Sequence, residues 1–561
     1  MANVFYYGFP NANADDRWTY WETHRPPAVA FDIETVSLDE RHPIGIGVAF
    51  SPQEAFYFKL GEGYSQKGLE ALGKILADVR IVKIAHNIMF DMGVFPLIPD
   101  IGSRLDRANI FDTNVAARLL GYQFTALSDV LPEFGLSTTP ADQLLKKYGV
   151  KTMSELDPMV VADHCAQDCK GTYRIWMEWE EKIHKQYGEY FKVEMAVIPI
   201  LLDLSMQGIE IDQKSRQELE DRYTIETEFY RRHIQSFGIE NPGSAKQVGL
   251  ILADRGNFLK FTKSKRQLKT DEASLEFLDD PLAAAVLQYR KKSKFLNTYL
   301  LPLKGEDRFY TEYYLDTVVG RLNSRNRNIQ NIPGADADSG DPGARFMLVP
   351  NSGTFTTGDF AKEHMFILAQ LSQDRKLLEV LYDPDPKRSD VHQLTADLIH
   401  TSRKIAKVVN YAMPYGGTAE TISENGKIRD KDFCEHLLES WFRAYPGAAD
   451  WIKYAQREGM RTGWALPTMF NRRIRIPQDE SENKQRNKAV NYPILGSDGE
   501  VIKRAIILCN NRRLGPPVLA MTVHDSLTWD GDVEDKIPKE ELEQIPGYRI
   551  PFEIKQTVRW E

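Results

Sequence analysis

The sequence predicts two folded parts: an α/β domain up to about residue 185, and a larger α+β domain in which helices dominate. Three observations predict this. The 561 residues are too many for one compact core. Apolar and polar residues alternate as in a strand from Ala28 to Glu34, and further strand-like runs follow. From about Glu194 onward, apolar residues recur at the three-and-four spacing of helices.

Composition narrows the class of protein. Hydrophobic residues make up 42% of the chain and charged residues 27%, and we find no apolar run long enough to cross a bilayer. The first residues lack the form of a signal peptide. Four scattered cysteines do not suit a disulfide framework or a zinc site, so we expect reduced thiols in a cytosol.

Charge is unevenly distributed along the chain. The net charge of −9 argues mildly against a nucleic-acid partner, but basic residues gather in three runs, at 260–269, 290–294 and 472–475. Each run alone is typical of a solvated surface. Beside concentrated carboxylates, the runs indicate an enzyme that grips a polyanion at its rim and holds metal at its centre.

The first strand carries two acids on one face. Asp32 and Glu34 project the same way because side chains alternate across a strand. Asp91 follows a later strand, and a helix places His164 and Asp168 on one face by their four-residue spacing. Acids this close repel each other unless a cation lies between them, and the set suits two divalent ions for phosphodiester hydrolysis. Solvent-facing acids on an edge strand are the alternative.

The segments DIET, HNIMFD and HCAQD, in this order, resemble the proofreading 3′–5′ exonuclease domain of family A (bacterial DNA polymerase I-like) DNA polymerases. The resemblance implies a ribonuclease H-like fold whose metal-binding acids are Asp32, Glu34, Asp91 and Asp168. His164 stands where the family has a tyrosine that orients the attacking water. Imidazole can orient or deprotonate water near neutral pH, so we expect an active exonuclease with a different pH profile.

Two polar segments begin the central region of the second part. Arg321, in VGRLNS, and Gln330, in NIQNIP, can donate hydrogen bonds to groove edges and phosphates, although a structured loop is the alternative. The segments resemble the TGRLSS and PNLQNIP blocks of the same family, with Val319 in place of threonine. The resemblance implies that Arg321 contacts the primer end in the minor groove.

Two strands deliver acids that lie far apart in the sequence. Asp359 follows TFTTG and Asp525 follows VLAMTVH, so together they suit a two-Mg²⁺ site for phosphoryl transfer. Alone, each acid is more often a cap or turn residue. The segments resemble motifs A and C of the family. This implies that Asp359, Asp525 and the backbone of Phe360 hold the metal and that His524 contacts DNA.

The segment RKIAKVVNYAMPYGG places Arg403, Lys407, Tyr411 and Tyr415 four residues apart, as one stripe along a helix. Two cations at this spacing can hold a polyphosphate, and an aromatic ring can pack against a sugar or base. A solvated basic helix with core tyrosines is the alternative. Pro414 is expected to end or kink the helix, because it lacks an N–H and disfavours helical geometry before it.

This segment resembles motif B, the nucleotide-binding helix of the fingers. The resemblance implies that Arg403 and Lys407 bind phosphates and that His392 reaches the triphosphate. It also implies that Tyr411 lies by the sugar and that Tyr415 sits at a hinge beside the template base. Because a tyrosine hydroxyl can replace a missing 3′-hydroxyl interaction, we expect ready incorporation of dideoxynucleotides.

Three further positions depart from the family pattern. The glutamate that blocks a 2′-hydroxyl aligns with His364, with Glu363 one place early, so either residue is the expected sugar gate. Ser526 replaces an accessory glutamate of motif C, from which we expect a modest effect. Leu495 replaces a glutamine near Asn491, which removes one donor to the template or primer groove. These changes leave room for unusual fidelity or base tolerance.

The resemblance covers residues 26–561 and implies a right-hand polymerase domain after the exonuclease domain. We expect an N-terminal extension at 1–25, the exonuclease domain at 26–185 and the polymerase domain at 186–561. Within the latter we expect a thumb at about 213–305, a palm at about 306–375 and 481–561, and fingers at about 376–480. No 5′-nuclease domain is expected to precede them. The predicted DNA contacts are Arg321, Gln330, Asn491, His524, Arg472 and Arg473.

The implied function is template-directed DNA synthesis from dNTPs with 3′–5′ proofreading, using two Mg²⁺ per site, for which Mn²⁺ can substitute. The implied setting is bacteriophage genome replication in the cytoplasm of an infected bacterial host. We expect a monomer without membrane contact that binds primer-template DNA and dNTPs. A replisome helicase, primase or single-strand binding protein are further candidate partners. The alternatives are a repair or lesion-bypass DNA polymerase, a single-subunit RNA polymerase-like enzyme, and a DNA-binding scaffold with degenerate sites.

Overall fold

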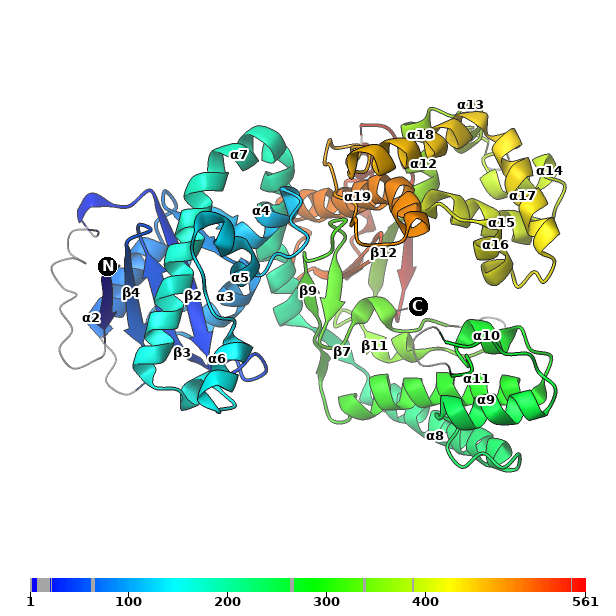
Figure 1. Ribbon diagram of the computed structural model, residues 1–561, viewed down its shortest axis with the longest axis horizontal. Coiled ribbons are helices and arrows are strands. Elements are labelled where there is room, and N and C mark those ends of the chain that lie inside the picture. The colour runs from blue at the N-terminus through cyan, green and yellow to red at the C-terminus, as the bar shows by residue number, and fades with distance from the viewer. Residues whose placement is uncertain are drawn as a thin grey trace.

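The computed structural model describes residues 3–7, 21, 23–61, 66–262, 267–335, 340–385, 388–545 and 547–560. Lys263, Lys265 and Arg266 of the first basic run lie outside these residues. An α/β domain is joined through one long helix to a larger α+β domain (Figure 1). Within the described ranges, no helix combines the length and apolar character needed to cross a membrane. All four cysteines are buried free thiols.

The first domain is built on a mixed sheet in the order β1-β4-β3-β2-β5-β6. β2, β3 and β4 form an antiparallel meander, whereas β5 and β6 continue from β2 in parallel. At the other edge β1 pairs in parallel with β4, so part of the segment expected to be an extension belongs to this sheet. The strands are β1 (Asn3–Tyr7), β2 (Ala28–Thr35), β3 (Pro43–Ala49), β4 (Glu54–Lys59), β5 (Val82–Ala85) and β6 (Ile110–Asp112).

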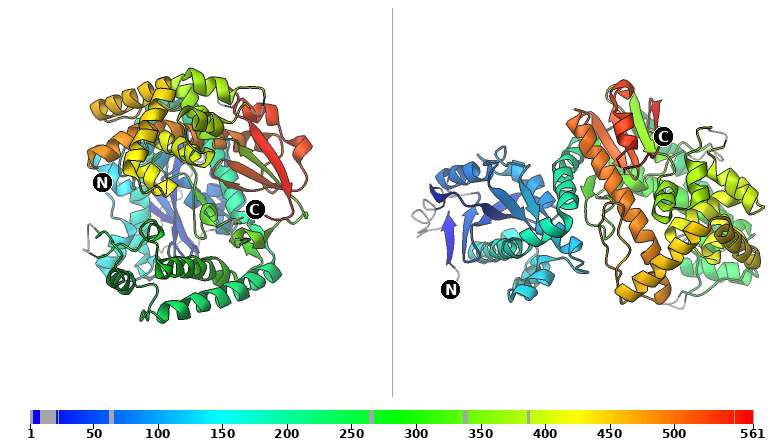
Figure 2. Two further views of the ribbon diagram at one scale, coloured as in Figure 1. Left: turned by 90° about the vertical axis from the view of Figure 1, so that its right-hand side faces the viewer. Right: turned by 90° about the horizontal axis from the view of Figure 1, so that it is seen from above.

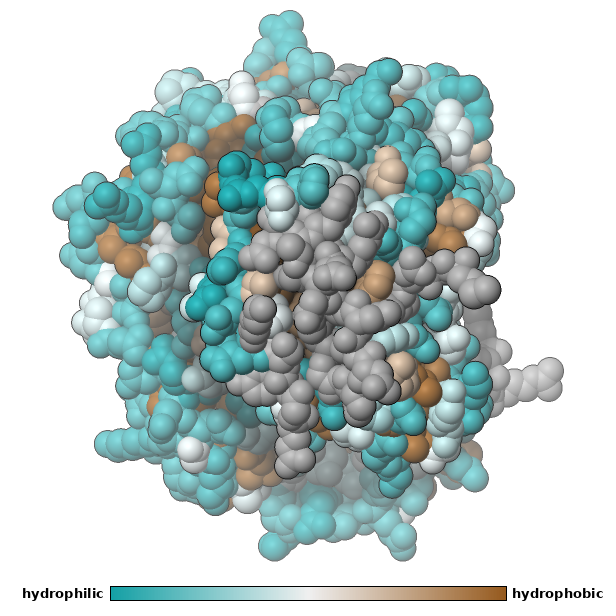
Figure 3. Space-filling view, turned by 90° about the vertical axis from the view of Figure 1, so that its left-hand side faces the viewer, coloured by the Kyte–Doolittle hydropathy of each residue, from teal (hydrophilic) through white to brown (hydrophobic). Residues whose placement is uncertain are grey.

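Short helices surround this sheet, and the visible outer face of the domain is mainly hydrophilic with scattered apolar residues (Figure 3). They are α2 (Gln66–Leu76), α3 (Ile88–Val94), α4 (Thr113–Leu119), α5 (Leu127–Val130) and α6 (Ala141–Tyr148), with 3₁₀ turns η1 (Phe95–Leu97), η2 (Leu131–Phe134) and η3 (Met153–Glu155).

The long helix α7 (Pro158–Gln207) connects the two domains. Asp157 caps its start by accepting a hydrogen bond from the Met159 N–H. Its first half packs on β2, β3 and β4, and its second half packs on α19 of the second domain. A kink at Tyr187, whose φ is −135° and ψ 19°, separates the halves. One helix therefore contributes to both cores.

The centre of the second domain is an antiparallel sheet in the order β13-β14-β12-β15. The polypeptide reaches it twice, because β12 precedes the other three strands by more than 150 residues. Its elements are β12 (Phe355–Phe360), β13 (Leu519–Val523), β14 (Ser526–Asp530), η9 (Glu534–Lys536), α20 (Lys539–Glu543) and β15 (Phe552–Thr557). Smaller sheets beside it contain β7 (Ile209–Ile211), β8 (Arg308–Phe309), β9 (Glu312–Tyr314), β10 (Asn323–Arg325) and β11 (Leu348–Val349), with 3₁₀ turns η5 (Leu301–Leu303), η6 (Ile329–Asn331) and η7 (Ala344–Met347).

Two helical lobes lie on opposite sides of β12 in Figure 1. The lower lobe has its own small apolar core, which includes Ile234, Leu252 and Val286. It contains α8 (Gln213–Gln235), α9 (Ala245–Asp254), α10 (Glu272–Glu276) and α11 (Pro281–Lys294), and it ends in a π-helical turn, η4 (Phe295–Leu300). This lobe corresponds to the expected thumb.

The upper lobe corresponds to the expected fingers. Its helix α15, which carries Arg403, Lys407 and Tyr411, ends at Ala412, a 3₁₀ turn holds Met413–Tyr415, and Gly416 follows with a positive φ of 69°. The expected break at Pro414 is confirmed. Its helices are α13 (Arg375–Leu381), α14 (Val391–Leu398), α15 (Arg403–Ala412), η8 (Met413–Tyr415), α16 (Ala419–Gly426), α17 (Lys431–Ala444) and α18 (Pro446–Thr462). α12 (Glu363–Ser372) and α19 (Glu482–Asn511), which fall in the expected palm, connect this lobe to the central sheet.

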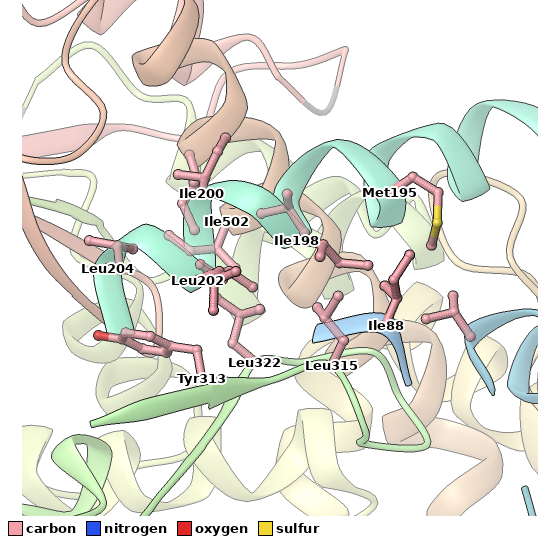
Figure 4. Packing of buried hydrophobic residues seen from close by; sticks show 14 of the residues in the cluster. Ile88, Met195, Ile198, Ile200, Leu202, Leu204, Tyr313, Leu315, Leu322 and Ile502 are labelled. Carbon is pink, nitrogen blue, oxygen red and sulfur yellow. The ribbon is translucent and has the colours of Figure 1, made fainter. Parts of the chain in front are cut away.

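The junction between the domains is apolar around a buried ion pair. Figure 4 shows residues of the second half of α7, such as Ile198 and Leu202, packed among side chains from both domains. In the same region Lys503 of α19 donates to Glu194 of α7, with side chains 0% and 4% exposed. The Tyr190 hydroxyl lies 3.2 Å from the Lys503 ammonium. A buried charge of either sign would be unstable here without its partner.

We therefore predict that Lys503→Met lowers the free energy of unfolding by about 3–5 kcal/mol, because Glu194 is left charged and buried. The double variant Glu194→Leu/Lys503→Met should recover much of this loss. The control is Glu482→Gln, which breaks an exposed ion pair with Arg486 and should change stability by less than about 1 kcal/mol. Denaturant unfolding measures all three, and equal losses in the single and double variants would contradict the prediction.

Candidate active sites

The acids of the first domain converge from three elements. β2 presents Asp32 and Glu34, the first turn of α3 presents Asp91, and α7 presents Asp168. The Ile33 N–H donates to Asp91 Oδ1 at 2.9 Å, which fixes this carboxylate against β2. The structure thus brings together the four acids predicted from the sequence.

These carboxylates lie together largely out of water, and among the described residues no lysine or arginine forms an ion pair with them. Burial and neighbouring acids raise the pKa of Asp32 to about 6, and burial raises that of Asp168 to about 7. The pKa values of Glu34 and Asp91 are raised well above their ordinary values, by burial first and then by the other acids. Such a donor set fits divalent cations, which favour carboxylate oxygens.

Two further side chains face this cluster. His164 Nε2 lies 3.8 Å from Glu34 Oε1 and 3.9 Å from Asp168 Oδ2, and burial lowers the His164 pKa, against the effect of Asp32. The Cys165 thiol donates to Asp32 Oδ2 at 3.4 Å. Ligand atoms of Asp32, Glu34 and Cys165 lie within 4.8 Å of one another. Cys165 was missed because nothing in its sequence context distinguishes it from a core cysteine.

The central sheet of the second domain carries the other pair of predicted acids. Asp359 lies near the end of β12, and Asp525 lies in the turn between β13 and β14, opposite it. The Phe360 N–H donates to the Asp525 carbonyl at 3.3 Å, which holds the two segments together. Burial, Asp525 and Glu553 raise the pKa of Asp359 to about 7. This second carboxylate pair also fits a divalent cation.

Glu553 on β15 is a third acid that sequence reasoning missed. It pairs directly across from Asp359, whose other cross-strand neighbour is Ser526 on β14. Residues directly opposite on neighbouring strands share a face, so Glu553 points to the same side as Asp359. Asp359, Ser526, Glu553 and Lys555 line a cavity of about 410 Å³. Because β15 pairs with β12, Glu553 adds a carboxylate next to Asp359, on the side opposite to Ser526.

Cations cluster at the start of α15, where Ser402 caps the helix. Arg403 Nε donates to Asp390 Oδ2 at 2.8 Å, and Lys407 Nζ lies 5.7 Å from the centre of the Tyr411 ring. His392 is 3% exposed, and its Nδ1 lies 3.0 Å from Asn410 Nδ2. Burial lowers its pKa to about 4, and the nearby cations Arg403, Lys362 and Lys407 add to this shift. Lys362, which follows β12, is a further cation that the sequence did not single out.

Comparison with known proteins agrees with this arrangement. A family model described as "DNA polymerase family A" matches residues 210–546, and one described as "3'-5' exonuclease" matches residues 19–183. The chain belongs to DNA polymerase family A. DNA polymerase I of Chloroflexus aurantiacus is 26% identical over 95% of this chain, and that of Synechocystis sp. is 28% identical over 92%. The chain spans only 59% and 56% of these two relatives.

A solved structure extends the comparison to the fold. It is described as "POL domain of Pol1 from M. smegmatis complex with DNA primer-template and dNTP". It is similar over 100% of this chain and 99% of its own, with a TM-score of 0.78 and 19% sequence identity. At this identity the similarity concerns the family A fold: an exonuclease domain followed by a polymerase domain.

In this family A chain, His364 and Tyr415 meet where the fingers join the central sheet. The Tyr415 hydroxyl lies 2.7 Å from His364 Nδ1, and the two rings are 5.5 Å apart, edge to face. Glu363 is 2% exposed and lies close to Asp498, the carboxylate that His364 also faces. Burial and Asp498 raise its pKa well above the ordinary value. Of the two predicted gate residues, His364 is the one that contacts Tyr415.

The predicted DNA-contact residues fall into two groups. Arg321, Gln330 and His524 line one cavity of about 220 Å³, and Asn491 is half-buried on α19. Arg473 is exposed, with its guanidinium 5.4 Å from the centre of the Trp464 ring. These residues remain candidates for DNA contact.

The prediction that Arg472 contacts DNA is wrong. Its side chain is 3% exposed, and its guanidinium donates to the Tyr190 hydroxyl at 2.9 Å and to the Val318 carbonyl at 2.6 Å. Arg472 is buried because it lies at the junction between the domains, where α7 covers its side chain. A run of arginines in sequence does not reveal which one turns inward.

We predict that Arg472→Met lowers the free energy of unfolding by about 1–3 kcal/mol, because buried acceptors lose their donor. Its neighbour is the matched control: Arg473→Ala should change stability by no more than about 0.5 kcal/mol. Arg473→Ala should instead weaken duplex binding and reduce its salt dependence, as loss of a phosphate contact does. Thermal unfolding and fluorescence-anisotropy titration would measure both effects, and equal stability losses would contradict the assignment.

Proposed function

We propose that this chain catalyses template-directed DNA synthesis from dNTPs on a primer 3′-hydroxyl and removes primer ends by 3′–5′ exonucleolysis. The observation that carries the proposal is a pair of carboxylate clusters, one in each domain of a family A chain, of which the first is largely buried and the second lines an open cavity. Concentrated acids of this kind serve phosphoryl transfer when cations join them. Primer-template DNA and dNTPs are the substrates that we propose.

The residues that would hold the cations differ between the sites. In the polymerase domain they are Asp359, Asp525 and the backbone of Phe360. In the exonuclease domain they are Asp32, Glu34, Asp91 and Asp168. Mg²⁺ suits these oxygen donors, and Mn²⁺ should replace it. When bound, such ions lower the pKa of the attacking hydroxyl or water and neutralise charge on the leaving group.

The remaining roles follow from charge and position. Arg403, Lys407 and Lys362 surround the His392 imidazole and would bind the triphosphate, while Tyr411 would lie against the sugar. The Arg403 guanidinium would be shared between a phosphate and Asp390, which it contacts here. On the primer side, the common cavity of Arg321, Gln330 and His524 supports contact with the minor groove. In the exonuclease domain, neutral His164 would orient the attacking water.

Rival functions differ in their support. A single-subunit RNA polymerase is disfavoured, because the matching family is a DNA polymerase family. The similar solved structure, described as a complex with primer-template DNA and dNTP, supports DNA substrates here. Repair or lesion-bypass synthesis is the second candidate. Exonuclease activity on mismatched primer ends distinguishes it from proofreading replication. Bacteriophage genome replication in an infected host remains a prediction, because the similar curated proteins are bacterial DNA polymerases I.

A pair of variants tests the proposal. Asp359→Ala should lower primer extension by about 100-fold or more and leave primer degradation intact, whereas Asp32→Ala should do the reverse. Glu540→Ala, at an exposed acid, is the control and should change neither. Extension of a labelled primer with Mg²⁺, on matched and mismatched ends, measures both activities. A wild-type chain that neither extends nor shortens primers would exclude the proposal.

Tyr411 provides a separate prediction about sugar use. Because its hydroxyl can replace the interaction of a missing 3′-hydroxyl, the wild type should accept dideoxynucleotides readily. Tyr411→Phe removes only the hydroxyl and should lower dideoxynucleotide use by about 10-fold or more relative to deoxynucleotides. Competition between the two nucleotide types in chain-termination assays measures the ratio. Strong rejection of dideoxynucleotides by the wild type would count against this placement of Tyr411.

A further inference from the structure

Asp498 is a buried carboxylate in the middle of α19 that none of the roles above assigns. Its side chain is 1% exposed, although charged side chains are rarely buried without partners. Its Oδ2 lies 2.6 Å from Arg321 Nε and 3.6 Å from His364 Nε2. Asp498 therefore faces a primer-side arginine and the gate histidine at the same time.

His364 is held from both sides of its ring. Nε2 faces Asp498, and Nδ1 lies 2.7 Å from the Tyr415 hydroxyl. In neutral imidazole one nitrogen donates and the other accepts. The negative charge of Asp498, 3.6 Å away, favours the tautomer with its proton on Nε2, which leaves Nδ1 to accept from the Tyr415 hydroxyl. The carboxylate thus selects both the ring orientation and the tautomer that suit Tyr415.

This chain of contacts lies where a nucleotide sugar must pass. The triphosphate cations Arg403, Lys407 and Lys362 surround His392, whereas the acids of the catalytic site lie on the central sheet. The charges of Asp525 and Asp359 influence Tyr411, and that of Asp525 also influences Tyr415, so both phenols border the site. A nucleotide that spans the cations and the acids must place its sugar beside them.

We propose that Asp498 is a positioning residue that holds His364 against Tyr415 and thereby sets the preference for deoxyribonucleoside over ribonucleoside triphosphates. The proposal rests on the polymerase function proposed above. Asp498 touches neither the nucleotide nor the reacting atoms and acts through His364. The same carboxylate ties Arg321 to this pair, so the groove-side arginine and the gate share one anchor.

Asp498→Asn tests the proposal, because it keeps the side-chain shape and removes the charge. Single-nucleotide extension with a dNTP and the matching rNTP gives kcat and KM for each. We expect kcat/KM for the dNTP divided by kcat/KM for the rNTP to fall by about 10-fold, mainly through a higher KM for the dNTP. In a His364→Gln background, Asp498→Asn should change the ratio by less than about 2-fold, because the two residues act as one unit.

Glu500→Gln is the matched control, since Glu500 is also fully buried on α19 but pairs with Arg504. It should leave the sugar ratio unchanged even if it lowers the melting temperature. Asp498→Ala is the second variant should Asp498→Asn fail to fold, with the same expected ratio. An unchanged ratio in a folded Asp498 variant, or a full additional effect in the His364→Gln background, would overturn the proposal. Failure of the wild type to extend primers would instead refute the proposed function.

Discussion

The buried pair of Glu194 and Lys503 is the constraint on which the arrangement of the two domains depends. Removing two charges from water is costly, and their attraction offsets this cost only while both remain in place. Glu194 lies in the second half of α7 and Lys503 on α19, so the pair fixes to the second domain the helix whose first half packs on the first sheet. Tyr190 and Arg472 add hydrogen bonds around the same point. The two acid clusters are therefore held at a fixed separation by the cores themselves.

Each acid cluster destabilises the folded chain, because neighbouring carboxylates repel one another. The same crowding of carboxylates suits each cluster to bind cations. In each, β-strand geometry places an acid beside other acids and partly out of water, which raises the pKa values of Asp32 and Asp359. A hydrophobic or paired arrangement would be more stable, and the chain has paired such acids elsewhere, as with Asp341 and Lys292. Acids whose pKa values stay raised despite nearby Lys555 and His164, amid an otherwise well-paired structure, indicate functional sites.

Local patterns predicted the strand of Asp32, the helix of Asp168 and the end of α15 at Pro414, because these depend on alternation, helical spacing and backbone chemistry. The residues that were missed depend on tertiary pairing. Glu553 joins Asp359 only because β15 pairs with β12, and Asp498 meets His364 only because α19 crosses the fingers junction. Arg472 and Arg473 are adjacent in sequence, yet packing buries one of them alone. Sequence order could locate the acids but not their partners.

The lower lobe has an apolar core of its own, and this affects how the lobe can move relative to the rest of the chain. A lobe that buries its own hydrophobic residues keeps its internal packing when it swings as a rigid body. Only the contacts at its base need to rearrange, and there the chain passes through the π-helical turn η4. Lys292, which binds both Glu226 of the thumb and Asp341 beyond it, limits how far that base can open. This lobe can thus shift relative to the central sheet, within the limit set by Lys292, while its own core stays folded.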